Sequence, residues 1–351
     1  MSLPPQPTRG LRLALALLVS LVLAASLAAC GGPEREPPRV DGPVTDGQLA
    51  RELKGAVSER GAFDHLRALQ RIADDNGGNR AAPGPGFTKS VDYVIGSLRR
   101  SGYTVDIPTY VGHEHAGPPA TLRNVVAQTR TGDPERVVVI GAHVDSVEAG
   151  PGIVDDGSGV ATLLEIADRL GASPPVRQAV RFVFFGSEET GLEGSTAYVD
   201  GLSAEERQKI MLYLNVDMVA SSNGGYRVQG GAGHDESTSG PPGSAAVARV
   251  LAEQLGTTGV TAETVEFVGD DEWPFVEAGI PSGGAENGDH GVKSEEQARA
   301  WGGQAGQVFD PCFHSACDRV DNVNRVVLDH YLHALAGTVA YFATVDEKPF
   351  E

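Results

Sequence analysis

The sequence predicts an α/β fold with a mostly parallel, mixed central sheet and helices on both of its faces. Three short, continuous apolar runs, the pattern of strands buried on both faces, occupy residues 136–141, 180–185 and 210–216. An amphipathic helix is indicated between the first two runs, at residues 160–170, with Gly171 as its stop. Strands that alternate with helices along the chain are typical of a parallel sheet covered by helices.

The segments on either side add further helices and short strands. Apolar residues recur at helical spacing in four more places. We expect helices at residues 49–75, 87–100, 245–255 and 328–342, and short strands at residues 103–109 and 123–129. The glycine-rich segment 224–243 is long for a plain connection, and we interpret it as a loop at the rim of a functional site.

The bulk composition excludes one class of partner. The 351 residues suit one large α/β domain or two modest ones, and 40% of them are hydrophobic, which is enough for a packed core. The formal net charge is -19, from 47 acidic and 28 basic residues. Such a surface repels phosphate backbones, so no nucleic-acid partner is expected, whereas cations and amines are attracted. Solubility of an exported protein would also explain this charge.

Residues 1–29 have the pattern of a lipoprotein signal peptide. Two arginines precede an apolar run that is too short for a spanning helix and ends in small residues. Cys30 then stands where a bacterial lipobox places its acylated cysteine, although an ordinary signal peptide containing a cysteine is the alternative. Residues 30–48 are expected to be the lipidated cysteine and a flexible tether. We therefore predict an exported monomer, anchored to the outer face of the cell membrane or later released from it.

Cys312 and Cys317 remain once Cys30 is set aside, and they lie in one short segment. Outside the cytoplasm such a pair can form a disulfide that closes a small loop. Binding of a metal by the two thiolates is the alternative. We favour the disulfide, because a single histidine stands beside the pair and an oxidising compartment disfavours free thiols.

Chemically active side chains follow the ends of the three predicted apolar strands, where sites gather in open α/β sheets, and a histidine is added by the later cysteine segment. In chain order they are His143, Asp145, Asp155, Glu188, Glu189, Asp217 and His314. Imidazole and carboxylate groups are ligands that suit zinc, with three per ion and room for water. Each short motif alone is typical of a solvated loop, but their repetition at successive strand ends predicts a metal site.

Five motifs, in order along the chain, resemble the secreted double-zinc aminopeptidases of bacteria. The motifs are GAHVDS, GPGIVDDGSG, FGSEETGLEGS, LNVDM and FDPCFHSACD, and the resemblance covers about residues 66–342. The wider peptidase family also contains glutamate carboxypeptidases and glutaminyl cyclases. The resemblance implies a single zinc-exopeptidase-like catalytic domain at residues 49–346, with two Zn²⁺ per chain and peptides as substrates.

The resemblance also implies a role for each side chain. One zinc would be held by His143, Asp155 and Asp217, and the other by Asp155, Glu189 and His314, so that Asp155 bridges the two. Glu188 would be the general base, which takes a proton from a zinc-bound water and returns it to the leaving amine. Asp145 would fix the tautomer of the His143 imidazole, unless it only caps a turn. The peptide bond between Asp155 and Asp156 is expected to be cis.

Two positions depart from the family pattern. Phe313 stands where these aminopeptidases carry a tyrosine that steadies the reaction intermediate, and Gly269 stands at an arginine that helps to fix the substrate terminus. Acidic side chains that could bind the substrate ammonium group follow at Asp270, Asp271 and Glu272. A calcium site is doubtful: Asp329 fits one ligand position of relatives that bind Ca²⁺, but His333 replaces a second carboxylate.

An extracellular aminopeptidase is the leading hypothesis, and two alternatives stay open. The altered pocket is also compatible with a two-zinc carboxypeptidase, dipeptidase or amidase. A peptide-binding lipoprotein without catalysis is the second alternative, although it would have no use for a general base at Glu188. The remaining histidines are assigned no ligand role; they are His65, His113, His115, His234, His290 and His330.

Overall fold

The computed structural model describes residues 47–112, 119–231 and 240–345. The predicted signal peptide, Cys30 and nearly all of the predicted tether lie outside these ranges, as do His113, His115 and His234. Within the ranges, no helix combines the length and apolar character needed to cross a membrane.

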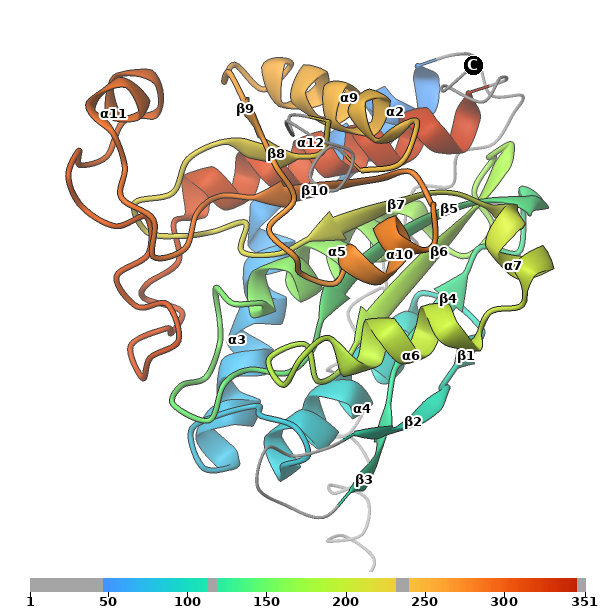
Figure 1. Ribbon diagram of the computed structural model, residues 1–351, viewed down its shortest axis with the longest axis horizontal. Helices are drawn as coiled ribbons and strands as arrows, with labels where there is room; N and C mark the ends of the chain where they lie inside the picture. Colours follow the sequence, from blue (N-terminus) through green and yellow to red (C-terminus); the bar gives the residue numbers. More distant parts are fainter. Residues whose placement is uncertain (1–46, 113–118, 232–239, 346–351) are drawn as a thin grey trace, which may run out of the picture. The chain divides into compact units, whose positions relative to one another are not determined.

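An eight-stranded mixed sheet forms the centre of the fold (Figure 1). Its order is β1 (Val105–Asp106), β4 (Val125–Gln128), β6 (Gln178–Phe185), β5 (Asp133–His143), β7 (Ile210–Val216), β10 (Ser282–Glu286), β8 (Arg227–Gln229) and β9 (Glu263–Val265). The four central strands run parallel, whereas β4 and β8 pair antiparallel with their inner neighbours. A separate antiparallel pair joins β2 (Thr109–Gly112) to β3 (Ala120–Arg123). The predicted mostly parallel, mixed sheet is confirmed.

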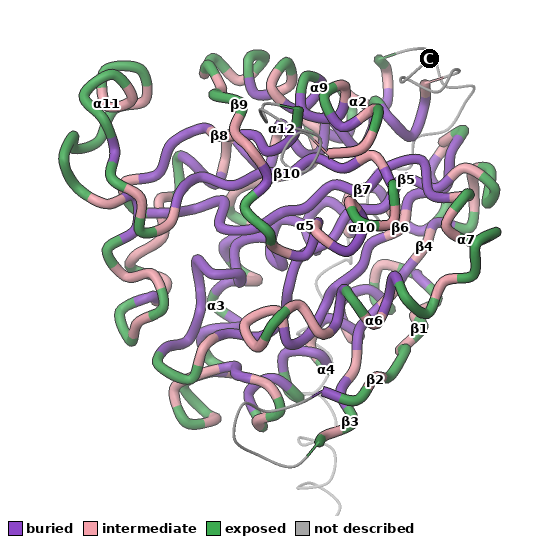
Figure 2. The backbone as a smooth tube through the Cα atoms, in the orientation of Figure 1, coloured by how far each residue is buried: buried purple, intermediate pink, exposed green. Residues whose placement is uncertain are grey.

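Side chains of β5 alternate between two apolar layers, because successive residues of a strand point to opposite faces. Val138 and Ile140 belong to the larger core, which also contains α5 (Gly157–Leu170) and α12 (Arg325–Thr344). Val137 and Val139 belong to a smaller core with residues of α6 (Glu193–Gly201) and α10 (Trp273–Glu277). Helices therefore cover both faces, as predicted, and the strands between them are buried along most of their length (Figure 2).

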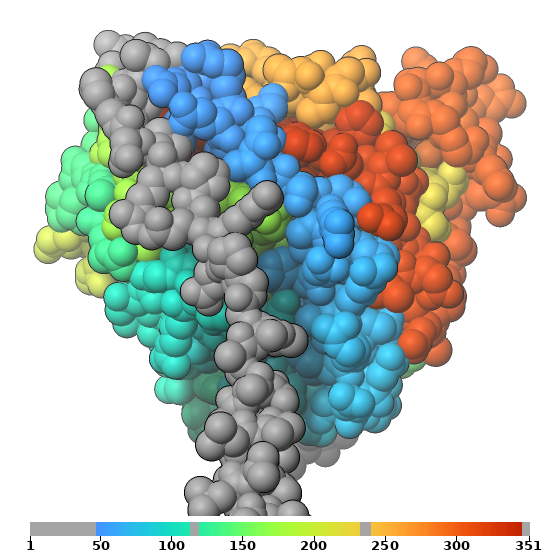
Figure 3. All heavy atoms as spheres, turned by 180° about the vertical axis from the view of Figure 1, so that it is seen from behind, coloured from blue at the N-terminus to red at the C-terminus, as the bar shows by residue number. Residues whose placement is uncertain are grey.

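The long helix α12 organises the larger layer. It contacts α2, α3, α5 and α9, and nearly all of its middle turns are buried. Figure 3 shows this face, with the blue helices of residues 48–100 beside the red α12. The other helices are α2 (Gln48–Ala56), α3 (Glu59–Asp75), α4 (Pro85–Arg100), α7 (Ala204–Lys209), α9 (Ser244–Gly256) and α11 (Glu295–Trp301).

Capping residues explain where helix bounds differ from the sequence prediction. The prediction of a single helix at residues 49–75 is wrong, because the chain forms two helices there, α2 and α3. Ser58 adopts an extended conformation between them, and its Oγ caps α3 by accepting a hydrogen bond from Gly61 N. Helix α5 begins earlier than predicted, because the Asp156 carboxylate caps it by accepting from Gly159 N at 2.8 Å. Gly171 ends α5 at a φ of 69°, as predicted.

Some elements carry no clear sequence pattern. Strand β8 lies inside the glycine-rich segment 224–243, for which the sequence predicts a rim loop without a strand. Strand β10 reads SGGAE and shows no apolar run, although all five residues are buried. The helices α6, α7, α10 and α11 are too short for helical periodicity to identify them.

Candidate metal centre

Three neighbouring parallel strands deliver chemically active side chains to one edge of the sheet. Strand β5 ends at His143, Asp217 directly follows β7, and Glu188 and Glu189 follow the end of β6. Because β5 pairs in parallel with both β6 and β7, the carboxyl ends of the three strands lie side by side. This topology brings together residues that are far apart in the sequence.

The Asp155 carboxylate lies between two imidazoles. Its Oδ1 is 3.1 Å from His143 Nε2, and its Oδ2 is 3.0 Å from His314 Nε2. Each imidazole faces a second carboxylate as well: His143 Nε2 is 3.6 Å from Asp217 Oδ2, and His314 Nε2 is 3.0 Å from Glu189 Oε2. The five predicted ligands thus converge as two groups that share Asp155.

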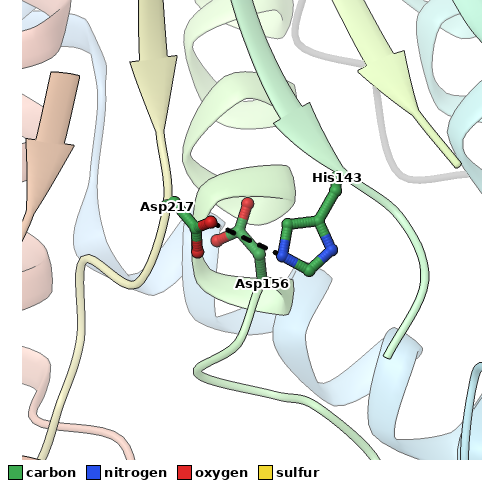
Figure 4. A group of neighbouring side chains, drawn as sticks. All are labelled: His143, Asp156 and Asp217. Carbon is green, nitrogen blue, oxygen red and sulfur yellow. Dashed lines mark ion pairs between the residues drawn. The ribbon is translucent and has the colours of Figure 1, made fainter. Parts of the chain in front are cut away.

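Asp156 is the neighbouring carboxylate, and its position differs from that of Asp155. It lies close to His143 and Asp217, as Figure 4 shows, and the three could together hold a metal ion. Its Oδ1, however, accepts hydrogen bonds from Gly159 N and Met218 N, so this carboxylate joins the start of α5 to the segment after β7. The peptide bond between Asp155 and Asp156 is cis.

The donor set fits a zinc site. Imidazole nitrogens and carboxylate oxygens are common zinc ligands, and the His143 side chain is only 1% exposed. Asp217 Oδ1 and Glu189 Oε1 are buried and accept no hydrogen bond from any described residue. Buried carboxylate oxygens without a donor are costly unless a cation compensates them. A bound zinc ion would supply that compensation.

Crowding of charge shifts the pKa values of these groups. Hydrogen bonds that the His314 imidazole donates to the carboxylates of Asp155 and Glu189 raise the pKa of His314 to about 10. Burial and the like charge of Asp155 raise the pKa of Glu189 to about 7. Burial disfavours the charged form of Asp155, but His143 and His314 outweigh it and hold the pKa of Asp155 below its usual range. Without a metal, the raised pKa of His314 favours its protonated form at neutral pH, and a bound metal ion would have to displace that proton.

Glu188 lies at the edge of this cluster. Its Oε2 is 4.0 Å from His143 Nε2, and its side chain is 16% exposed. Burial and the like charges of Asp271 and Asp217 raise the pKa of Glu188 well above its ordinary value. A partly accessible carboxylate that favours protonation is suited to accept and return a proton near neutral pH.

Asp145 connects the two strand ends. Its carboxylate accepts hydrogen bonds from Glu188 N and Glu189 N, at 3.2 and 3.3 Å. Its Oδ1 also lies 3.6 Å from His143 Nδ1, on the side of the ring away from Asp155. The geometry therefore combines both roles considered for Asp145, since it caps the turn of Glu188 and Glu189 and faces the imidazole.

Two buried residues that the sequence analysis missed hold the loop between His143 and Asp155. Arg80 is fully buried, and its guanidinium donates to the carbonyl oxygens of Val144, Pro151 and Gly152. A buried arginine that donates to backbone carbonyls fixes a loop that has no secondary structure of its own. No local motif around residue 80 signals this distant role.

Asp318 is the second supporting residue. Its Oδ1 accepts from Val154 N at 2.8 Å, and its Oδ2 accepts from Asp155 N at 3.1 Å. It directly follows Cys317, which forms the predicted disulfide with Cys312. The disulfide segment therefore both carries His314 and holds the backbone of Asp155. Asp318 is the last residue of the motif FDPCFHSACD, so the motif was a usable signal for it.

A cavity of about 200 Å³ opens onto the cluster. It is lined by Asp155, Glu188, Glu189, Asp217, Met218, Arg227, Val268, Asp270, Glu286, Asp289, Phe313 and His314. Asp270 and Phe313 were predicted to contact substrate, and they lie in this lining. Asp271 and Glu272 do not, because both are buried and Glu272 accepts hydrogen bonds from Gly269 N and Asp270 N.

The two departures from the family pattern alter this cavity. The Phe313 ring stacks on His314 at 3.8 Å between centroids and on His290 at 5.7 Å, and it offers no hydroxyl. Gly269 adopts a φ of 94°, a conformation that favours glycine, and contributes no side chain. Arg227, Glu286 and Asp289 were not identified from the sequence, since each reaches the cavity through sheet pairings or loops remote from the motifs.

Other histidines lie apart from the cluster. His333 Nε2 is 3.4 Å from Asp329 Oδ1, one turn away on α12, so the two residues considered for calcium contact each other. His65 Nδ1 lies 2.6 Å from Tyr93 Oη, and His330 Nδ1 lies 2.9 Å from Thr258 Oγ1.

Several known proteins are similar to this chain in sequence. The sequence model of peptidase family M28 matches residues 124–339. An aminopeptidase of Pseudomonas aeruginosa (strain UCBPP-PA14) is 45% identical over 63% of this chain and 41% of its own. Leupeptin-inactivating enzyme 1 of Streptomyces exfoliatus is 41% identical over 78% and 59%, and the probable lipoprotein aminopeptidase LpqL of Mycobacterium tuberculosis is 41% identical over 79% and 56%. The chain thus spans about half the length of these curated relatives.

Solved structures share the fold at lower sequence identity. A zinc aminopeptidase from Bacillus subtilis aligns with a TM-score of 0.66 and 17% identity, over 83% of this chain and 96% of that one. A glutaminyl cyclase of Porphyromonas gingivalis aligns with a TM-score of 0.61 and 20% identity, over 81% and 98%. These similarities establish a zinc-exopeptidase-like fold.

The contact of Asp318 with the Asp155 backbone yields a first prediction. The substitution Asp318→Asn keeps the size of the side chain but turns an NH₂ group toward a backbone N–H. We expect the free energy of unfolding to fall by about 1.5–3 kcal/mol, the range for buried hydrogen bonds to a charged group. Urea unfolding of the metal-free protein measures this. Asp321→Asn, at a nearby exposed carboxylate, is the control, and equal stability of both variants would contradict the assignment.

Proposed function

This chain belongs to peptidase family M28, and from that premise we propose that it is an exported aminopeptidase that hydrolyses N-terminal peptide bonds with two zinc ions. The observation that carries the proposal is the Asp155 carboxylate, whose two oxygens face two imidazoles at 3.1 and 3.0 Å. Two cations held close together need a shared anionic ligand to offset their repulsion. A carboxylate that faces one imidazole with each oxygen supports the role of a bridging ligand.

We assign the ligands as two sets. His143, Asp155 and Asp217 would hold one ion, and Asp155, Glu189 and His314 the other. Asp156 is left out, because the family resemblance assigns the bridging role to Asp155 and because Asp156 Oδ1 is engaged by two backbone N–H groups, although its Oδ2 is buried without a donor from the described residues. When bound, the zinc ions supply a water of lowered pKa and polarise the scissile carbonyl.

The chain's own residues then handle the proton. Glu188 accepts it from the attacking water and delivers it to the amine nitrogen as the C–N bond breaks, which leaves Glu188 ionised again. Asp145 keeps Glu188 in place through the backbone and faces the His143 imidazole. Asp270, which lines the cavity, would bind the ammonium group of the substrate.

We also propose that the protein is a lipoprotein, anchored at Cys30 to the outer face of the membrane. The printed name of the Mycobacterium tuberculosis relative, a probable lipoprotein aminopeptidase, supports this proposal. The disulfide between Cys312 and Cys317 supports export, since such bonds persist outside the reducing cytoplasm.

The shared ligand predicts how many ions each variant retains. We expect Asp155→Asn to lose both zinc ions, because an amide cannot bridge two cations as a carboxylate does. His314→Ala should lose only one. Elemental analysis after dialysis measures the zinc content per chain. Asp156→Asn, at the adjacent carboxylate, is the control and should retain both ions; retention of both by Asp155→Asn would exclude the bridging role.

If Glu188 is the general base, its substitution should lower the rate without a loss of metal. We expect Glu188→Gln to lower kcat by about 10²- to 10⁴-fold, because the amide cannot accept the proton of the attacking water. Steady-state kinetics together with zinc analysis separates this effect from metal loss. Glu205→Gln, an exposed carboxylate on α7, should behave as the unmodified protein. Near-normal activity of Glu188→Gln would rule out the assigned mechanism.

The requirement for a free amino terminus is tested with matched peptides that differ only at that terminus. We expect stepwise release of N-terminal residues from the free-amine peptide and no cleavage of its N-acetylated form, because the cavity presents carboxylates to an ammonium group. Mass spectrometry of the products follows both reactions. Cleavage of the acetylated peptide, or trimming from the other end, would instead indicate an amidase or a carboxypeptidase, and binding without cleavage would indicate a peptide-binding lipoprotein.

A further inference from the structure

A buried ion pair forms part of the cavity wall beside the metal ligands. In the antiparallel pairing of β8 and β10, Arg227 lies directly opposite Glu286, and Arg227 Nη1 is 3.0 and 2.9 Å from the two carboxylate oxygens. In the parallel pairing of β10 and β7, Ala285 lies opposite Val216. The next residues along the chain, Glu286 and Asp217, are therefore neighbours, and both line the cavity.

The pair is costly for stability alone. The Glu286 side chain is 7% exposed and the Arg227 side chain 19%, so both charges have lost most of their water. Burial raises the pKa of Glu286 to about 7, although Arg227 opposes that shift. Apolar residues of similar volume often replace a buried ion pair at no cost in stability. Charges kept in the wall of a substrate cavity point to a polar ligand.

The charge of the cavity gives the sign of that ligand. Apart from the proposed zinc ligands and Glu188, the ionisable lining consists of Asp270, Glu286, Asp289 and Arg227. Three carboxylates and one guanidinium sum to -2 with imidazoles counted as neutral. If Asp270 binds the terminal ammonium, Glu286 and Asp289 against Arg227 leave -1 for the rest of the substrate. A second cationic group is therefore favoured, and an anionic group is disfavoured.

The cavity also offers an apolar path to these carboxylates. Met218, Val268 and Phe313 line it together with the acidic residues. The methylene stem of a lysine or arginine packs on apolar side chains while its charged end reaches a polar group. The Asp289 carboxylate lies 2.7 Å from the exposed His290 imidazole at the rim, and its side chain is 32% exposed. It is thus accessible to a long side chain.

We propose that this cavity selects peptides whose N-terminal residue is lysine or arginine, and that Glu286 and Asp289 bind the cationic end of that side chain. This inference rests on the aminopeptidase function proposed above. Arg227 acts as a positioning residue, which orients the Glu286 carboxylate and keeps the charge of the pocket from becoming more negative.

The test compares 4-nitroanilides of lysine, norleucine and glutamate with the full chain carrying zinc. Lysine and norleucine have equally long methylene stems and differ in the terminal ammonium. We expect kcat/KM for lysine to exceed that for norleucine by about tenfold or more, the effect of one hydrogen bond to a charged partner, and the glutamate compound to be the poorest. Equal or better cleavage of norleucine would overturn the inference.

Substitutions of opposite sign sharpen the test. Glu286→Gln and Asp289→Asn each remove one negative charge and should lower the lysine-to-norleucine ratio, whereas Arg227→Gln should raise it. The rate on norleucine reports whether each variant is folded, and Asp289→Asn, at the rim, carries the test if Glu286→Gln does not fold. Glu295→Gln, at an exposed carboxylate on α11 outside the cavity lining, should leave the ratio unchanged.

The outcomes separate the two proposals. Cleavage of all three compounds without a preference for lysine overturns the specificity inference and leaves the aminopeptidase function standing. Cleavage of none, with zinc bound, overturns both. An unchanged ratio in both carboxylate variants shows that Glu286 and Asp289 do not select the side chain.

Discussion

The position of the Asp155 carboxylate is the constraint on which the rest of the site depends. Its two oxygens must face ligands from different parts of the chain, His143 at the end of β5 and His314 in the disulfide segment. Neither secondary structure nor local sequence fixes the intervening loop. Buried polar contacts do so instead: Arg80 holds its carbonyl groups, and Asp318 holds its N–H groups. The geometry of the proposed metal centre thus depends on residues outside the proposed ligand sets.

Concentrating carboxylates in one buried cavity works against folding and in favour of function. Burial and mutual repulsion raise the pKa values of Glu188, Glu189 and Asp217. The apolar layers on both faces of the sheet must offset this cost, since few other interactions are large enough. The same negative charge that works against folding favours the binding of divalent cations, and it leaves Glu188 suited to proton transfer.

Sequence patterns predicted what depends on local periodicity and on strand ends. The buried strands β5, β6 and β7, the helices α5 and α12, and the clustering of His143, Asp155, Glu188, Glu189, Asp217 and His314 follow from such patterns and from the family resemblance. Strand β10, with the sequence SGGAE, is stabilised by pairing with its neighbours and not by the β-propensity of its residues. No sequence pattern therefore predicts it. Arg80 acts across more than sixty residues of sequence through backbone carbonyls, which no spacing rule could anticipate.

The strand pairing that brings the proposed ligands together also explains why the pocket residues were not identified from the sequence. Arg227 and Glu286 are neighbours only because β8 folds back against β10, and β10 lies beside β7. Each residue alone is typical of an exposed charged side chain. Once the strands pair, both charges line the same cavity as Asp217, where Phe313 offers no polar group. In the proposed function the sheet would therefore couple catalysis to selectivity, because the proposed ligand Asp217 directly follows β7 and the next two strands carry the charges of the cavity wall.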